Sequence, residues 1–127
     1  MRIHLDFERK HWDNAEAKIL AAFSKKDGKG ISHAWSEKSL FEDFQKVKAS
    51  SSFNASTGSN FQFTSSTGDT IIVVGMGEKT KAKSEAVRRA VAHGYKAIAG
   101  EKFKSAALDV SSFNSLGNIG NCLELIN

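Results

Sequence analysis

Residues 69–100 constrain the fold more than any other stretch of this chain. They begin with a β-branched run at 70–74 that has almost no polar alternation, which is typical of a strand buried on both faces of a sheet. Gly75 and Gly77 follow, and glycine suits a sharp exit from a strand because it adopts positive φ without a Cβ clash. From about residue 80 the apolar residues recur at helical spacing. The stretch therefore predicts a central strand, a glycine turn and a helix that ends near Gly100.

The expected helix at 80–100 has one small apolar face and one mainly basic face. The apolar face carries Val87, Ala90, Val91, Gly94 and Ile98, and the opposite face carries Glu85, Arg88, Arg89, Ala92 and Lys96. Such a division is typical of a helix that packs on a sheet with one side in water. We expect the apolar face to contact the sheet.

Two further strands are expected before residue 25. Alternation of apolar and polar residues at 3–7 predicts a strand with one face buried. Residues 17–23 are apolar apart from Lys18 and predict a second strand. A helix over 14–23 is the alternative, because Ala, Glu and Lys favour helix.

The middle and end of the chain supply a helix, a hairpin and a last strand. Residues 36–50 predict a helix with Ser36 as its cap and acidic residues in its early turns; its apolar positions are Leu40, Phe41, Phe44 and Val47. Residues 61–63 predict a strand that turns back into 70–74 as a hairpin. Residues 105–110 predict a further strand, and 114–127 a terminal helix.

Strands interleaved with helices, plus one hairpin, predict an α/β fold with a mixed, mostly parallel sheet between two helix layers. With 127 residues the chain is long enough for one domain with a single core. The one cysteine, Cys122, excludes an internal disulfide, and no run is long enough to span a membrane. A cytoplasmic protein without membrane contact is expected.

Three segments together resemble the amino-terminal domain of the leucyl (cytosol) aminopeptidases: IIVVGMGEK, AVRRAVAHGYKAI and SAALDVSSF. That family has a strand ending in a V-G-x-G-K-like turn, a helix with an L-R-K-A-like segment, and a strand ending near an acidic residue. Val74, Gly75, Met76, Gly77 and Lys79 match the turn, with Glu78 inserted before the lysine. Val87, Arg88, Arg89 and Ala90 match the helix, and Ala107, Leu108 and Asp109 match the strand.

The resemblance implies a macrodomain-like α/β/α domain over residues 1–127, belonging to a longer aminopeptidase and truncated before its catalytic domain. In that family two divalent metals, zinc or manganese, lie in the carboxy-terminal domain, which also carries an N-T-D-A-E-G-R-like motif. This chain has no such motif, so the resemblance transfers no catalytic residue and no metal ligand. It implies a non-catalytic accessory domain whose partners are its own catalytic domain and the other subunits of a hexamer.

Two other functions remain open from the residues themselves. Gly75, Gly77 and Lys79 would hold the phosphate of a nucleotide or ADP-ribose if their backbone N–H groups lay at a helix N-terminus. The dinucleotide fingerprint lacks its third glycine, because position 80 is Thr, so a structural turn is favoured.

The excess of positive charge lies between positions 78 and 104, which hold 8 basic and 3 acidic residues, whereas the rest of the chain holds 10 basic and 11 acidic residues. Arg88, Arg89 and Lys96 on the basic helix face would contact the phosphates of DNA. A solvated helix face is the favoured interpretation, because few aromatic residues interleave with the charges. The four histidines show no metal-ligand spacing.

Overall fold

The computed structural model describes residues 2–6, 15–25, 30–33, 35, 37–78, 92, 96, 105–109 and 112. Its elements are β1 (Arg2–Asp6), β2 (Ala17–Ser24), β3 (Ile31–Ser32), α1 (Lys38–Lys48), β4 (Asn60–Thr64), β5 (Thr70–Glu78) and β6 (Ser105–Asp109). The strands form one six-stranded sheet in the order β1-β6-β2-β5-β4, and β3 pairs with β2 off this path.

The sheet is mixed and mostly parallel, which confirms the predicted α/β class. The pairs β1 with β6, β6 with β2, and β2 with β5 are parallel. The β4–β5 hairpin and the short β2–β3 pair are antiparallel. The strand interpretation of 17–23 is correct and the helical alternative is wrong. The middle of the path is β2, whereas we expected the strand at 70–74 to be central; β5 lies between β2 and the outer strand β4.

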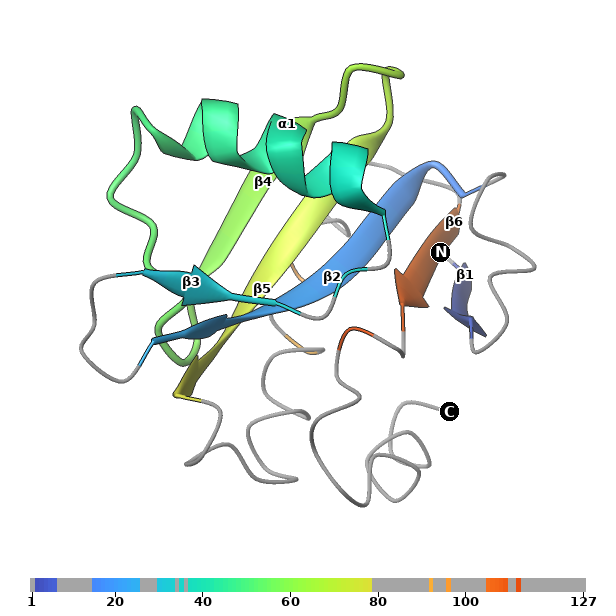
Figure 1. Cartoon of the computed structure of the whole chain (residues 1–127). Coiled ribbons are helices and arrows are strands. Elements are labelled where there is room, and N and C mark those ends of the chain that lie inside the picture. The colour runs from blue at the N-terminus through green and yellow to red at the C-terminus, as the bar shows by residue number, and fades with distance from the viewer. Residues whose placement is uncertain are drawn as a thin grey trace.

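Helix α1 lies across one face of the sheet, over β4, β5 and β2 (Figure 1). Its apolar stripe forms because Leu40 and Phe44 are one turn apart, and both are buried. The Phe44 ring contacts the rings of Phe61 and Phe63 on β4, and Leu20 of β2 belongs to the same core. Trp35, just before the helix, donates its indole N–H to the Ala21 carbonyl oxygen of β2 at 2.6 Å.

The opposite face of the sheet is equally buried. Its side chains include Ile19, Phe23, Ile72, Val74 and Met76, each at most 1% exposed. The helix expected at 80–100 lies outside the described residues apart from Ala92 and Lys96. Both are helical and exposed, as expected for the face turned to water.

Two local predictions differ from the structure. The strand at 70–74 does not leave the sheet at Gly75 but continues as β5 to Glu78. The N-cap of α1 is Glu37, with no side-chain cap hydrogen bond, instead of Ser36, which lies outside the described residues. The terminal helix expected at 114–127 also lies outside them.

Candidate functional site

Gly75 and Gly77 lie inside β5, where the loop formed by residues 55–59 crosses the strand. The Gly75 N–H donates to the Ser59 carbonyl oxygen at 2.8 Å, and the Gly77 N–H donates to the Ala55 carbonyl oxygen at 2.9 Å. A Cβ at Gly75 would overlap the Ser56 carbonyl oxygen and the Ser59 hydroxyl. Gly77 also has a φ of +74°, which favours glycine. Gly75 is therefore required by the close approach of the loop backbone, and Gly77 by its positive φ and the nearby Thr57 hydroxyl.

This geometry does not favour the phosphate-binding hypothesis. The N–H groups of Gly75 and Gly77 already donate to carbonyl oxygens, so a phosphate would have to displace the loop at 55–59. Lys79, the third candidate, lies outside the described residues. Phosphate binding at this position stays a prediction.

The nucleic-acid candidates are described only in part. Lys96 is helical and exposed, which fits a residue on a water-facing side of a helix. Arg88 and Arg89 lie outside the described residues. DNA binding through this helix also stays a prediction.

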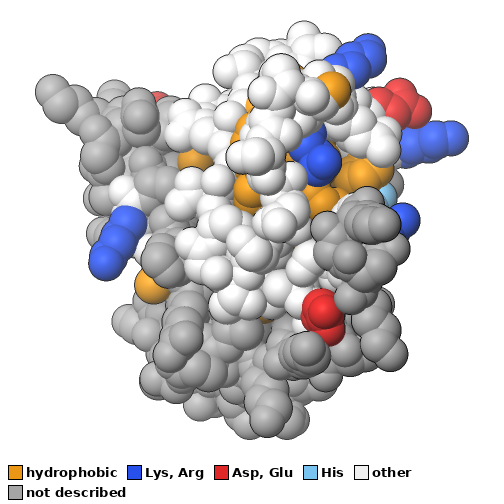
Figure 2. All heavy atoms as spheres, turned by 90° about the vertical axis from the view of Figure 1, so that its left-hand side faces the viewer, with side chains coloured by type: hydrophobic (Ala, Val, Ile, Leu, Met, Phe, Trp, Pro, Cys, Tyr) orange, Lys and Arg blue, Asp and Glu red, His pale blue; other side chains and the backbone are white. Residues whose placement is uncertain are grey.

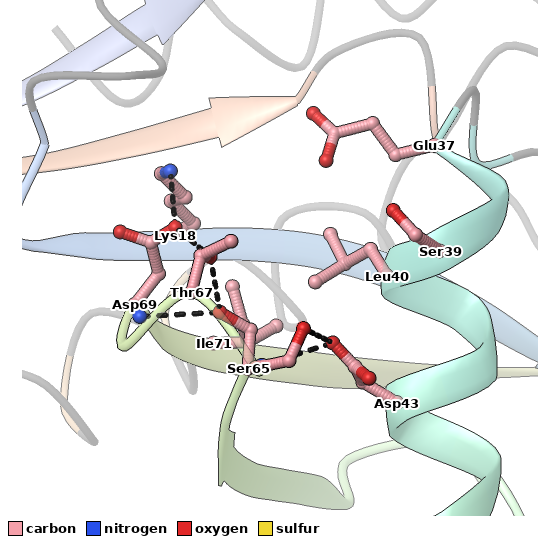
Figure 3. Close-up of a pocket in the computed structure, with 10 residues that line it drawn as sticks. Lys18, Glu37, Ser39, Leu40, Asp43, Ser65, Thr67, Asp69 and Ile71 are labelled. Atoms are coloured by element: carbon pink, nitrogen blue, oxygen red, sulfur yellow. Dashed lines mark hydrogen bonds and ion pairs between the residues drawn. The ribbon is translucent and has the colours of Figure 1, made fainter.

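A polar cluster at the turn of the β4–β5 hairpin was not among the predicted sites. We call Lys18, Ser65, Thr67 and Asp69 the hairpin cluster. Lys18 is 5% exposed, and its ammonium lies 3.0 Å from Oδ2 of Asp69 at the start of β5. The Thr67 hydroxyl donates to the same carboxylate oxygen at 2.9 Å, and the Asp69 N–H donates to Oγ of Ser65 at 3.1 Å. A buried cation is thus neutralised where the hairpin closes (Figure 3).

Helix α1 is joined to the same turn through Asp43. Its Oδ2 atom accepts hydrogen bonds from the N–H of Ser66 at 3.0 Å and from the Ser66 hydroxyl at 2.9 Å. These two hydrogen bonds are the main cause that lowers the pKa of the Asp43 carboxyl, because both stabilise its ionised form. The contact fixes the position of the helix relative to the hairpin.

A pocket of about 50 Å³ lies between α1 and the hairpin cluster, as Figure 3 shows. Its charged lining residues are Lys18, Glu37, Asp43 and Asp69. A space of this size holds water and no larger substrate. Because the carboxylates of Asp43 and Asp69 already accept hydrogen bonds from the hairpin, the arrangement orients α1 and the turn. Among the described residues, no three His, Cys, Asp or Glu side chains are grouped so as to hold a metal ion.

Sequence reasoning missed this cluster, although one signal for it was visible. Lys18 is a lone charge inside the otherwise apolar run at 17–23. A buried lysine requires an opposite charge nearby. The partner, Asp69, is 51 positions further along the chain, and only the parallel pairing of β2 with β5 places it next to Lys18.

The comparison with protein families gives a match over most of the chain. The family model described as the N-terminal domain of the cytosol aminopeptidase family matches residues 19–125. Among curated proteins, none matches the chain. In the part of the chain that the structure describes, no helix is long and apolar enough to cross a bilayer.

Proposed function

Because this chain belongs to the cytosol aminopeptidase family as its N-terminal domain, we propose that it is a non-catalytic accessory domain of a metal-dependent leucyl aminopeptidase. The parent enzyme would remove N-terminal amino acids from peptides in the cytoplasm. The accessory domain would pack on the catalytic domain and contribute to the assembly of the oligomer, a hexamer in the family that the sequence resembles.

The observation that carries this proposal is the extent of the family match, which runs from within β2 to near the end of the chain. The fold supports it, because every described strand except β1 lies wholly or largely within the match, and these strands pair as one unit around β2 and β5. The polar side chains of the hairpin cluster support it too, since they bind one another at the turn. Such internal pairing is typical of a structural role.

The proposal assigns no metal ligand to this chain. The two zinc or manganese ions expected of the parent would be bound by its catalytic domain, where they would polarise the peptide carbonyl and activate water. The described residues offer no grouped set of ligands that fits such a pair. We therefore derive no catalytic step from them.

Binding between this chain and the separately expressed catalytic domain of the same parent enzyme tests the proposal. We expect a stable complex in size-exclusion chromatography, together with a larger assembly of the catalytic domain when the accessory domain is present. A catalytic domain that neither binds this chain nor changes its oligomeric state upon addition of the chain would contradict the proposal.

A further inference from the structure

The outer strand β4 has one hydrogen-bonding side that no described strand occupies. On its other side it pairs with β5 in a register that places Phe61 opposite Val73 and Phe63 opposite Ile71. At the two ends of this ladder, the Ser65 N–H donates to the Asp69 carbonyl oxygen, and the Gly75 N–H donates to the Ser59 carbonyl oxygen. In an antiparallel pair, hydrogen-bonded positions alternate along each strand. The odd-numbered residues of β4 therefore bind β5.

It follows that Asn60, Gln62 and Thr64 direct their backbone N–H and C=O groups away from β5, toward the edge that no described strand occupies. All three residues are exposed. A free edge of this kind is a template for pairing with another strand. Soluble proteins usually block such an edge with lysine, proline or a bulge, whereas β4, with the sequence NFQFT, contains neither lysine nor proline, and its register with β5 is unbroken.

The described part of the surface around this edge is mostly uncharged. Figure 2 views the molecule from the side on which β4 is the outermost strand of the hairpin. Among the described residues on that face, uncharged polar groups and backbone predominate, hydrophobic side chains show between them, and separate basic and acidic side chains lie among and around them. Both signs of charge appear among the described side chains here, so these residues by themselves create no strong field of one sign against an identical surface.

We propose that β4 pairs with β4 of a second copy of this chain, antiparallel and centred on a two-fold axis at Gln62. This register places Gln62 opposite its own copy and Asn60 opposite Thr64. The three outward-directed residues then all occupy hydrogen-bonded positions, which gives about six backbone hydrogen bonds across the axis. Two six-stranded sheets would join into one continuous sheet.

The strand that fits the edge of β4 is β4 of a second copy, because its order of side-chain types is nearly the same when read in either direction. Reversed against itself, it matches Phe61 with Phe63 on the side of α1, and it matches amide and hydroxyl side chains on the other side. Such pairs are favourable across strands, and a strand without charges places no like charges opposite each other. An isologous contact of this kind is what a two-fold axis requires.

A five-residue strand buries less surface than a standard stable interface, so the dimer it forms is weak and reversible, and other contacts would reinforce it in a larger assembly. The biological purpose of this pairing rests on the proposed function, because the β4–β4 contact would contribute to the assembly of the oligomer. The contact itself is open to a separate test.

Sedimentation velocity of the chain over a range of concentrations tests the pairing. We expect a reversible dimer, weakened about tenfold by Gln62→Lys and by Gln62→Glu, because each change places like charges at the axis. An equimolar mixture of the two variants should dimerise at least as well as the unaltered chain, since the opposite charges then meet. Ser39→Lys and Ser39→Glu, at an exposed position in the first turn of α1, are the matched controls and should dimerise normally.

A cross-link gives a second measurement. In a chain carrying Cys122→Ser, Gln62→Cys should form a disulfide-linked dimer under mild oxidation, because hydrogen-bonded residues in antiparallel strands have Cα atoms about 5.5 Å apart. Ser39→Cys in the same background should not. A chain that stays monomeric at all concentrations, or dimers unaffected by the changes at Gln62, would overturn the inference. If the chain does not dimerise through β4 but still binds the catalytic domain, the proposed function stands and only this inference fails. If the dimers respond to charge at Gln62 but the chain does not bind the catalytic domain, the proposed function fails and the pairing stands.

Discussion

Gly75 is required by the loop at 55–59 that packs against it, and not by the conformation of its own strand. It has no space for a side chain, because the Ser56 carbonyl oxygen and the Ser59 hydroxyl lie where a Cβ would be. Gly30, by contrast, faces only the flexible end of the Lys25 side chain.

Gly75→Ala should therefore lower the free energy of unfolding by about 1–3 kcal/mol, the usual cost of overpacking a rigid site. Gly30→Ala should change it far less, since the Lys25 side chain moves easily. Urea denaturation of both variants measures the difference. Equal stability of the two variants would mean that the loop at 55–59 does not pack closely against Gly75.

The pair of Lys18 and Asp69 makes an asymmetric prediction. Asp69→Asn removes the carboxylate that lies 3.0 Å from the buried ammonium of Lys18 and should cost about 2–3 kcal/mol, at the low end for a buried pair because the Asp69 side chain is 34% exposed. Lys18→Met replaces the charge with an apolar side chain of similar length and should cost less than about 1 kcal/mol. Denaturant midpoints decide the order. A larger loss for Lys18→Met than for Asp69→Asn would contradict this account.

Asp43 gives a prediction for pH. The hydrogen bonds from Ser66 lower its pKa below the ordinary value of 3.8, so the folded state favours the ionised carboxylate. The stabilisation is then fully present above that ordinary value and is lost as the pH falls through the lower folded pKa. Asp43→Asn should reduce the loss of stability on acidification, and Ser66→Ala, which keeps the backbone N–H donor, should reduce it less. Urea midpoints measured from neutral pH down to about pH 3 test this, and three identical acid profiles would refute it.

At the scale of the element, one stripe of apolar side chains packs α1 on the sheet. Phe44 is 0% exposed and its ring lies among those of Trp35, Phe53, Phe61 and Phe63. Val47, almost one turn later on the same helix, is 41% exposed. The same helix thus offers a core position and a matched surface position.

Phe44→Ala should destabilise the fold by about 3–5 kcal/mol, since it leaves a cavity between the helix and β4. Val47→Ala should change stability by less than about 0.5 kcal/mol. Thermal denaturation followed by circular dichroism compares the two. Similar melting temperatures for both variants would show that α1 does not pack on the hairpin through Phe44.

At the scale of the whole molecule, we expect that the chain alone does not hydrolyse leucine p-nitroanilide, with or without added manganese or zinc. A two-metal peptidase site requires several carboxylates converging on ions roughly 3.5–4 Å apart. The carboxylates described at the hairpin instead accept hydrogen bonds from Ser66 and Thr67 and pair with Lys18. Turnover that survives rigorous removal of contaminating peptidases would overturn the assignment of this domain as non-catalytic.

Local pattern was sufficient for the elements that depend on short-range preferences. Alternation at 3–7, the apolar run at 17–23 and the β-branched run at 70–74 each predicted a strand, and each is present. The helix at 36–50 and the hairpin between 61–63 and 70–74 were also predictable, because side-chain periodicity reflects which face is buried. The same patterns, with the motifs around Gly75 and Asp109, were enough to identify the family.

Only the tertiary structure decided the features that depend on residues distant in the chain. The glycines at 75 and 77 look like a turn in the sequence, but the loop at 55–59 that crosses β5 is what excludes a side chain there. Lys18 looks like an isolated charge until β2 and β5 pair and bring Asp69 to it. The same pairing makes β2 the middle strand and leaves β4 at the edge. Periodicity reports how each segment divides between core and water, whereas strand order and close contacts arise from the packing of segments against one another, which no local window of sequence contains.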